Sequence, residues 1–172
     1  MDVPSTNQAY LSLGSNVEPE HHLPLAVTLL GRFGSVVATS TVWESPPAGK
    51  SEQPNYLNAA VLFETTLTPL QLREQAIAYI EAALGRVRTA DKNAPRPIDI
   101  DIMLFNHEVL QLGERHIPSP EITERAFVAV PLAEIAPGYV HPLNGATMAE
   151  IAARFSTAQA GLRPRADVVL AR

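Results

Sequence analysis

The chain has 172 residues, of which 46% are apolar and 18% are charged, a composition typical of one globular domain rather than a disordered segment. It contains no cysteine, which excludes disulfides, thiol nucleophiles and thiolate metal sites, and its net charge of −5 argues against nucleic acid as a partner. No stretch reaches the roughly 18 apolar residues of a membrane span, and residues 1–8 lack the pattern of a secretion signal.

The sequence of the first 43 residues predicts two strands that flank a helix. Residues 9–13 are a short apolar run typical of a buried strand. Apolar residues at helical spacing over 22–33 predict a helix, which Gly34 ends. The β-branched run 36–43 predicts a second strand. A proline-rich loop follows it.

The next part repeats this pattern with the helix between two longer strands. Residues 56–65 predict the third strand. A threonine-proline pair at 68–69 supplies the N-cap and first turn of a helix that reaches residue 84. Residues 86–97 lack apolar periodicity and predict an exposed loop, and residues 98–105 predict the fourth strand.

The order β-α-β-β-α-β is typical of a ferredoxin-like α+β sandwich with its helices on one face of the sheet. Short helices are predicted beyond it, over 123–136 and 148–155, and residues 161–172 are either a tail or an extra edge strand. We therefore expect one domain over residues 1–172 with its core at about 9–142. We also expect a cytoplasmic monomer or homodimer with no membrane or nucleic-acid partner.

The loop after the second helix is basic although the chain as a whole is acidic. It holds Arg86, Arg88, Lys92 and Arg96 against the single acid Asp91, a local charge of +3 (4 − 1). Such a loop indicates a binding site for a compact anion such as a nucleotide, and arginine matches phosphate oxygens better than lysine does. The alternative is a solvated charged loop.

The strongest chemical signal is the run Ile98-Asp-Ile-Asp-Ile102 in the fourth strand. Strand side chains alternate, so Asp99 and Asp101 share the face opposite to the isoleucines and repel each other. A divalent cation relieves this repulsion, and Mg²⁺ prefers oxygen ligands and leaves room for substrate phosphates. The alternative is an edge strand whose aspartates keep it soluble. Together with the basic loop, the pair indicates phosphoryl chemistry.

Several short motifs then occur in an order that resembles one known family. They are Tyr10-Leu-Ser-Leu-Gly-Ser-Asn16, Gln53-Pro-Asn-Tyr-Leu-Asn-Ala59, Glu81 followed by Gly85-Arg-Val-Arg88, Pro95-Arg96, Asp99-Ile-Asp101, Arg125-Ala-Phe-Val128 and Pro131-Leu-Ala-Glu-Ile-Ala-Pro137. With them the chain resembles the 6-hydroxymethyl-7,8-dihydropterin pyrophosphokinases of folate synthesis over about three quarters of its length. Each motif is weak alone, but so many in order on this frame are specific.

The resemblance implies a reaction in which ATP donates diphosphate to a small pterin alcohol, leaving AMP. Asp99 and Asp101 are implied to hold two Mg²⁺ ions, and with Arg86 and Arg96 they form the implied catalytic set. The resemblance also implies which residues contact the nucleotide: Glu81, Arg86, Arg88, Arg96, Ile102 and Arg125. The loops near Pro46 and over 86–97 are implied to close over the substrates.

The resemblance also implies the pterin site. Tyr56 and Phe127 would stack on the two faces of the ring, and Asn58 would hydrogen-bond its polar edge, beside Pro46 and Pro47. Stacked aromatic rings contribute about 0.5–1.5 kcal/mol beyond burial, and an amide offers both a donor and an acceptor. Without the resemblance, the residues alone favour the interpretation of both rings as core residues.

Two positions depart from the family pattern and suggest a divergent member. Asn93 stands where the family usually has a tryptophan near the adenine, and Ser119 where it usually has a phosphate-binding histidine. Two alternative functions therefore stay open. One is a weak or silent paralogue that binds pterin or nucleotide. The other is a two-metal nucleotidyl transferase, because such enzymes also carry carboxylates on a similar sheet.

Overall fold

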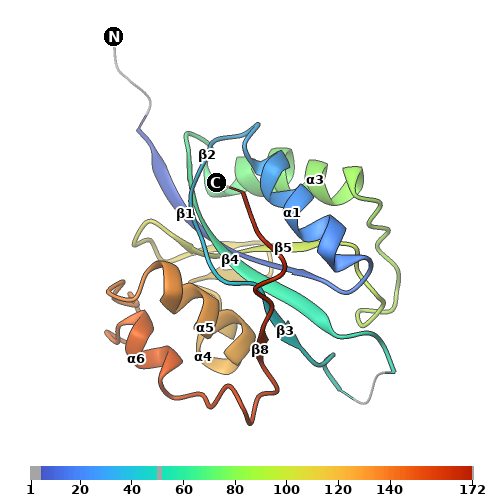
Figure 1. The fold of residues 1–172 in the computed structure, drawn as a ribbon. Helices are drawn as coiled ribbons and strands as arrows, with labels where there is room; N and C mark the ends of the chain where they lie inside the picture. The colour runs from blue at the N-terminus through green and yellow to red at the C-terminus, as the bar shows by residue number, and fades with distance from the viewer. Residues whose placement is uncertain (1–4, 50–51, 172) are drawn as a thin grey trace.

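The computed structural model describes residues 5–49 and 52–171, and the description below is confined to them. Its main sheet has six strands, all paired antiparallel (Figure 1). The strands of this sheet are β1 (Asn7–Ser15), β2 (Ser35–Thr39), β3 (Trp43–Ser45), β4 (Tyr56–Thr65), β5 (Asp99–Phe105) and β8 (Arg163–Pro164). The strand order β5-β1-β4-β3-β8, with β2 also on β4, confirms the α+β, ferredoxin-like prediction.

The strand predicted over 36–43 is in fact two short strands. Both β2 and β3 pair with β4, and the register of β2 shifts between Val36 and Ala38. Between them Ser40 stays on β4, because its N–H donates to Ala60 O at 2.9 Å and its Oγ accepts from Ala60 N at 2.8 Å. The chain therefore stays paired with β4 from β2 to β3, although the pairing is irregular between them.

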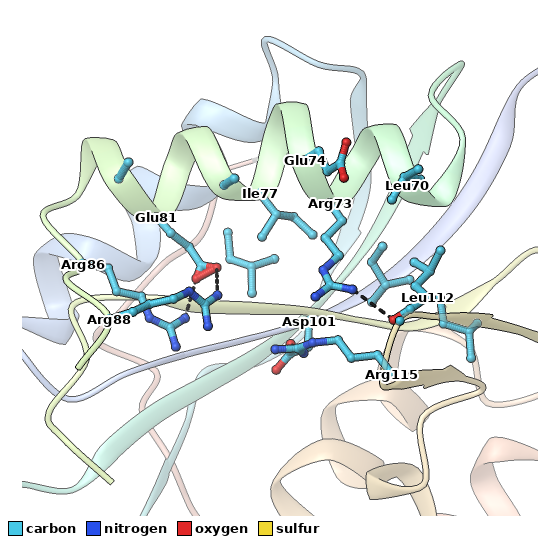
Figure 2. A pocket seen from close by; sticks show the side chains of 16 residues that line it. Leu70, Arg73, Glu74, Ile77, Glu81, Arg86, Arg88, Asp101, Leu112 and Arg115 are labelled. Atoms are coloured by element: carbon cyan, nitrogen blue, oxygen red, sulfur yellow. Dashed lines mark hydrogen bonds and ion pairs between the residues drawn. The ribbon is translucent and has the colours of Figure 1, made fainter. Parts of the chain in front are cut away.

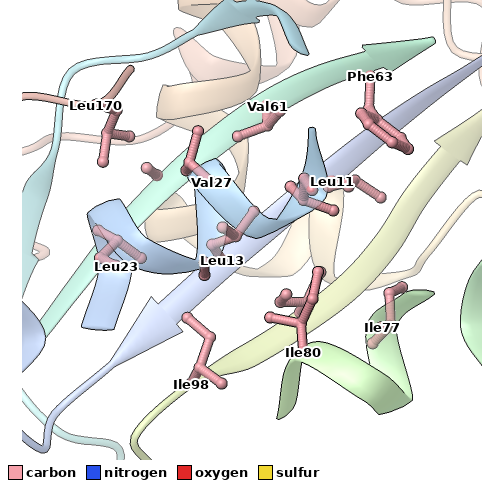
Figure 3. Close-up of a cluster of buried hydrophobic side chains, with 14 of the residues drawn as sticks. Leu11, Leu13, Leu23, Val27, Val61, Phe63, Ile77, Ile80, Ile98 and Leu170 are labelled. Atoms are coloured by element: carbon pink, nitrogen blue, oxygen red, sulfur yellow. The ribbon is translucent and has the colours of Figure 1, made fainter. Parts of the chain in front are cut away.

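Two helical segments cover the first face of the sheet, as predicted. They are α1 (Pro19–Leu30) and one continuous helix made of α2 (Pro69–Gln71), the π-helical turn η1 (Leu72–Ile77) and α3 (Ala78–Ala83). Thr68 caps the second segment, since its Oγ accepts from Gln71 N at 3.2 Å and its N–H donates to Gln71 Oε1 at 3.0 Å. Figure 3 shows the core between these helices and the sheet, which includes Leu11, Leu13, Leu23, Val27, Val61, Ile80 and Ile98.

The opposite face of the sheet is covered as well, which the prediction of helices on one face does not include. The helices there are α4 (Glu121–Glu124), α5 (Ala126–Ile135) and α6 (Met148–Ala152). They bury a second cluster with sheet residues such as Tyr10, Ala60 and Met103. These apolar side chains point away from α1 and α3, so the short C-terminal helices complete a three-layer structure (Figure 1).

Two further features lie outside the predicted βαββαβ unit. A two-stranded hairpin, β6 (Leu110–Leu112) and β7 (Arg115–Ile117), follows β5. At the C-terminal end β8 adds to the edge of the main sheet, and Val168 and Leu170 beyond it are buried in the first core. The extra edge strand is therefore the alternative that the structure contains. No helix in the described part of the chain is both long and apolar enough to span a membrane.

Candidate active site

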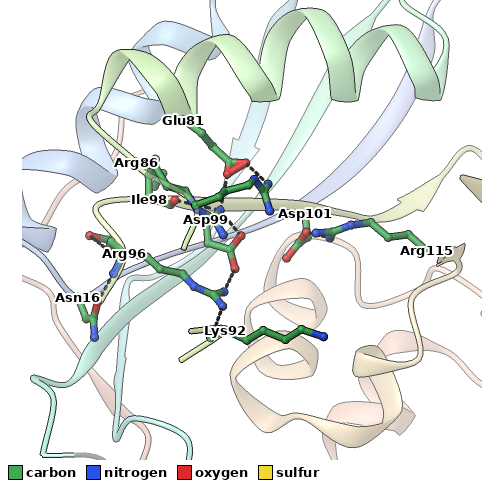
Figure 4. A network of polar contacts seen from close by, with 11 residues as sticks. Asn16, Glu81, Arg86, Lys92, Arg96, Ile98, Asp99, Asp101 and Arg115 are labelled. Atoms are coloured by element: carbon green, nitrogen blue, oxygen red, sulfur yellow. Dashed lines mark hydrogen bonds and ion pairs between the residues drawn. The ribbon is translucent and has the colours of Figure 1, made fainter. Parts of the chain in front are cut away.

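Side chains of β5 alternate between the two faces as predicted. Ile98 and Ile100 belong to the first core, and Ile102 packs against it. Asp99 and Asp101 lie on the other side of the strand, away from the helix that carries Glu81 (Figure 4). The strand is also an edge of the sheet. The two carboxylates are nonetheless only about one-fifth exposed, so they do more than keep an edge soluble.

Two arginines from the basic loop hold Asp99. Arg86 Nη1 donates to Asp99 Oδ1 at 2.8 Å, and Arg96 Nη1 donates to Asp99 Oδ2 at 2.9 Å (Figure 4). The backbone N–H of Arg96 also donates to Asn16 Oδ1 at 2.8 Å, which ties the loop to the end of β1. The arginines of the predicted anion site therefore converge on the predicted metal ligand, and the loop is not simply a solvated charged segment.

Glu81 extends this network from α3. It is 6% exposed, and its carboxylate accepts from Arg86 and lies 3.5 Å from Arg88 Nη2. Burial raises the pKa of Glu81, and the charge of Arg86 opposes this rise. Arg86 is the shared cation of Glu81 and Asp99, whereas Arg88 is 67% exposed and reaches the cluster from its rim. Sequence reasoning treats Glu81 as a weak candidate because most helical glutamates are solvated. This one is buried.

Asp101 has a different environment. Burial, followed by the negative charge of Asp99, raises its pKa to about 6, and the charge of Arg115 opposes the rise. The Arg115 guanidinium forms an ion pair with this carboxylate. Arg115 is a site residue that the sequence did not indicate, because it comes from β7 and only the folding of the hairpin brings it to β5.

A cavity of about 590 Å³ lies between the second helix, β5 and the hairpin (Figure 2). Five predicted nucleotide or metal residues line it, namely Glu81, Arg86, Arg88, Asp101 and Ile102. Further lining comes from Leu70, Arg73, Glu74, Ile77, Leu112 and Ile117, so this part of the cavity combines apolar side chains with two charged residues. Arg96 does not line the cavity, but it is hydrogen-bonded to Asp99, which lies two residues before Asp101. Arg125 is outside this lining, at the exposed start of α5, so its implied phosphate contact stays a prediction.

Strand register places the predicted pterin residues near the carboxylates. Gly14 of β1 is paired with Asp99 of β5 on one side and with Asn58 of β4 on the other. Paired residues of an antiparallel sheet point to the same face, and strands lie about 4.8 Å apart, so Asp99 and Asn58 flank a residue without a side chain. Tyr56 is two residues before Asn58 and shares that face. Ala60, two residues after Asn58 on the same face of β4, packs in the second core with residues of α5.

The amide of Asn58 is already oriented. It is 4% exposed, and its Nδ2 donates to Ser45 Oγ at 2.7 Å and to Trp43 O at 3.2 Å, both on β3. With both amide hydrogens used, its oxygen is the atom left to meet a ligand. Tyr56 is half-buried, which raises the pKa of its hydroxyl, and the charges of Arg96 and Asp99 act on it in opposite directions.

The remaining predicted pterin residues frame the same region. Phe127 of α5 is partly buried and packs against the second core, so a role as a core residue and a role at the site are both compatible with its position. Pro46 is exposed and Pro47 half-buried in the loop after β3. This loop includes residues 50–51, which lie outside the described part. The stacking of Tyr56 and Phe127 on a ring stays a prediction.

The donor set around Asp99 and Asp101 fits Mg²⁺. Within residues 5–49 and 52–171 there is no cluster of three or more His, Asp and Glu able to enclose a metal. Two carboxylates alone are an incomplete ligand set, and Mg²⁺ is the ion that proteins commonly hold through one or two carboxylates, with water and substrate phosphates completing its octahedron. Burial raises the pKa of Asp101 first and the charge of Asp99 second, and a bound cation would oppose both effects.

The two positions that depart from the family pattern take other contacts. Asn93 is exposed, and its carbonyl accepts from the Gln53 amide, which links the two loops on either side of the site. The Ser119 hydroxyl accepts from Glu121 N at 3.3 Å at the start of α4, and it lines a second cavity of about 410 Å³ rather than the first. Neither residue supplies a charge to the site.

Comparison with known proteins shows the family. A family model described as 7,8-dihydro-6-hydroxymethylpterin-pyrophosphokinase matches residues 10–137. The chain belongs to this pyrophosphokinase family. The 2-amino-4-hydroxy-6-hydroxymethyldihydropteridine pyrophosphokinase of Bacillus subtilis is 42% identical over 132 residues, covering 75% of this chain and 78% of the relative. That of Methylorubrum extorquens is 43% identical over 153 residues, covering 86% and 93%.

Solved structures agree on the fold of the pyrophosphokinase domain. Wild-type Plasmodium falciparum HPPK-DHPS with pteroate superposes with a TM-score of 0.66 at 18% identity, covering 90% of this chain but 43% of that one. A substituted form of the same protein gives a TM-score of 0.69 at 19% identity, covering 89% and 46%. The chain therefore spans less than half of those proteins.

Sequence identity corrects one expectation. The pyrophosphokinase of Haemophilus influenzae is 36% identical over 151 residues, which covers 86% of this chain. Identities of 36–43% over most of the chain show that it is not a divergent member, although Asn93 and Ser119 differ from the expected tryptophan and histidine. The replacements at these two positions therefore leave the rest of the family's sequence pattern intact.

Proposed function

We propose that the protein catalyses the ATP-dependent transfer of diphosphate to 6-hydroxymethyl-7,8-dihydropterin, giving the pterin diphosphate and AMP, as a step of folate biosynthesis. The observation that carries the proposal is the convergence of two carboxylates and two arginines beside a cavity of about 590 Å³. Membership of the pyrophosphokinase family supports the choice of substrates.

The cavity is the proposed nucleotide site. Its mixed end, where Leu70 and Leu112 lie beside Arg73 and Glu74, offers both apolar and polar contacts to a base, and its charged end at Arg86 and Arg88 suits the phosphates. Arginine forks bind phosphate oxygens in pairs, and in a partly buried site such charge-assisted hydrogen bonds are about twice as strong as neutral ones. Arg96 and Arg125 would reach the phosphates from the loop and from α5.

The pterin is proposed to lie on the sheet face that carries Asn58 and Tyr56. Gly14 leaves room between Asn58 and Asp99, so a ring held at Asn58 can direct its hydroxymethyl group toward the carboxylates. The Asn58 oxygen accepts from a ring N–H or amino group, and Tyr56 and Phe127 offer aromatic faces. The loops over 46–54 and 86–97 are proposed to close over both substrates.

Asp99 and Asp101 would hold magnesium, and we propose two ions. When bound, Mg²⁺ would neutralise charge on the phosphate oxygens and align the donor with the acceptor. The hydroxymethyl oxygen forms a bond to the β-phosphorus, the bond from that phosphorus to the oxygen on the α-phosphorus breaks, and AMP leaves with this oxygen. The hydroxyl proton passes to solvent. Arg86 and Arg96 bind the charge that develops during transfer, so catalysis is mainly positioning and electrostatic stabilisation.

One assay tests the proposal against its rivals. Protein, Mg²⁺, ATP and 6-hydroxymethyl-7,8-dihydropterin are mixed, and the products are identified by mass. AMP with a pterin diphosphate is the expected result. Tight binding without turnover would indicate a silent paralogue, and release of free pyrophosphate would indicate a nucleotidyl transferase. Because the reaction consumes ATP, we place the protein in the cytoplasm. Sedimentation with both substrates present would distinguish the proposed monomer from a homodimer.

A further inference from the structure

The C-terminal strand lies against the strand that leads into the proline-rich loop. β8 pairs with β3, with Trp43 opposite Pro164 and Glu44 opposite Arg163. The Arg165 N–H extends the pairing by donating to Val42 O at 2.8 Å. Leu162 before this strand is buried, and Val168 and Leu170 after it are buried in the first core, so the strand is anchored on both sides. β8 is therefore a well-packed edge strand of the main sheet.

Side chains of this segment hold Glu44 of β3. Arg163 Nη2 donates to Glu44 Oε2 at 3.1 Å, and Arg165 Nη1 lies 3.7 Å from Glu44 Oε1. Two hydrogen bonds fix this guanidinium locally, because Arg165 Nε and Nη2 donate to Asp167 Oδ1 and Oδ2 at 2.9 Å and 2.8 Å. Nη2 also reaches Glu20 of α1, at 3.4 Å. The Glu44 side chain is only 20% exposed, and these two arginines are the cations beside its carboxylate. Arg165 therefore joins β3 to the first helix.

Gly161 touches the proline that begins the loop. Its φ is +70°, and a Cβ added there would lie 3.2 Å from Pro46 Cδ and 3.3 Å from Pro46 Cγ. These separations are closer than nine in ten real Cβ contacts, so a side chain at this position would push Pro46 away by a few tenths of an ångström. Glycine is needed both for the backbone conformation and for the close approach.

β3 in turn orients the proposed pterin ligand. Asn58 donates to Ser45 Oγ and Trp43 O, both on this strand, so the position of β3 sets the direction of the Asn58 oxygen. We propose that residues 161–165 position the pterin side of the site, Gly161 by seating Pro46 and Arg165 by holding Glu44. The proposal rests on the function proposed above. These residues lie beyond residue 137, where the match to the family model ends.

The first test compares alanine substitutions at two glycines that have nearly the same positive φ. Gly161→Ala presses on Pro46, whereas Gly145→Ala is the matched control, because Gly145 has a φ of +72° and nothing within 4 Å of an added Cβ. Both variants should lose thermal stability because of the positive φ, and Gly161→Ala should lose somewhat more because its Cβ also presses on Pro46. We expect Gly161→Ala alone to raise the KM for the pterin, by about fivefold, while the KM for ATP stays within about twofold, since sub-ångström misplacement of one substrate is costly.

The second test needs no strained backbone. Arg165→Gln should raise the KM for the pterin, and Arg165→Lys should restore most of it because lysine keeps the charge opposite Glu44. Arg154→Gln, at an exposed arginine after α6, is the control and should change neither KM. Calorimetric titration of 6-hydroxymethylpterin with a non-hydrolysable ATP analogue present should give the same ranking of affinities.

The outcomes separate this proposal from the function on which it rests. A wild-type pterin KM in both Gly161→Ala and Arg165→Gln overturns the positioning role, and so does an equal rise of both KM values, which general loss of packing would produce. If Gly161→Ala does not fold, the Arg165 variants decide. If the wild-type protein does not turn over the pterin at all, the proposed function fails.

Discussion

Asp99 and Asn58 are both paired with Gly14, on opposite sides of β1, so one carboxylate and one amide face each other across a bare strand position. A Cβ at Gly14 would lie 3.5 Å from Asn58 Oδ1 and 3.7 Å from Tyr56 Cδ1, which are ordinary contacts. The sheet therefore tolerates a side chain there, and the glycine is explained by the space that it leaves between the proposed metal ligand and the proposed pterin ligand.

This relationship gives the first prediction. Gly14→Ala and Gly14→Val should fold with near wild-type melting temperatures, because the strand backbone accepts both residues. Pterin affinity should fall in the order Gly, Ala, Val, by at least about tenfold for valine, as the methyl groups fill the gap. Calorimetric titration measures the series. Unchanged affinity in Gly14→Val would place the pterin elsewhere.

Removal of either strand carboxylate should abolish turnover. Asp99→Ala and Asp101→Ala are expected to lower kcat by about a thousandfold or more while the circular dichroism spectrum is retained, because the proposed Mg²⁺ site loses a ligand. Glu150→Ala, at an exposed glutamate of α6, is the control. Activity is measured over a series of Mg²⁺ concentrations. Near wild-type kcat in both aspartate variants would rule out the metal assignment.

Asp101 should make stability depend on pH in a defined window. Its pKa is about 6 in the folded chain and 3.8 as the reference value, so the folded state binds the extra proton between these values. Stability therefore falls as pH rises from about 4 to about 6, and the whole penalty is present above that range. Asp101→Asn does not titrate. Its gain over wild type should be near zero at pH 4 and at most about 3 kcal/mol at pH 8.

Urea unfolding of both proteins in the presence of EDTA measures this difference. Added Mg²⁺ should remove most of it at pH 8 by stabilising the wild-type carboxylate form. A stability gap that is constant with pH would mean that the Asp101 carboxyl has the same pKa in the folded and unfolded chain.

The buried pair of Glu81 and Arg86 should be sensitive to loss of one partner. The two side chains are 8% and 9% exposed, so Arg86→Met leaves a buried carboxylate without its main cation and should cost about 3–5 kcal/mol. Arg88→Met removes the 67% exposed partner of the same glutamate and should cost less than about 1 kcal/mol. Glu81→Gln with Arg86→Met should recover much of the loss. Equal effects of the two single arginine variants in urea unfolding would contradict this.

Much of the site follows from local sequence pattern. The alternation of β5 separates Asp99 and Asp101 from the isoleucines, and the period of two in the sequence is sufficient to predict it. The basic loop is adjacent in sequence to β5, so its arginines have a short path to Asp99. The ferredoxin-like order follows from the succession of elements, because each has its own periodicity and its own start and stop residues.

What the sequence does not reveal depends on tertiary packing. Arg115 meets Asp101 only because the β6–β7 hairpin folds beside β5, and no spacing rule links the two residues. β8 has two residues, too few for any periodicity, and its position is set by pairing with β3. On the second face the prediction of one helix over 123–136 misses the break at Arg125 between α4 and α5, whose backbone is extended. The placement of these helices depends on apolar side chains such as Ala60 and Met103 that belong to distant strands.

β4 is covered by helices on both faces and flanked by strands on both edges, and seven of its ten residues are buried. Its central amides should therefore be among the slowest in the chain to exchange with deuterated solvent, since opening them requires both cores to open. Asn58 belongs to this strand. The residue proposed to bind the pterin is thus carried by one of the most rigid elements of the described chain, and adjustment to the substrate would then fall to the loops around it.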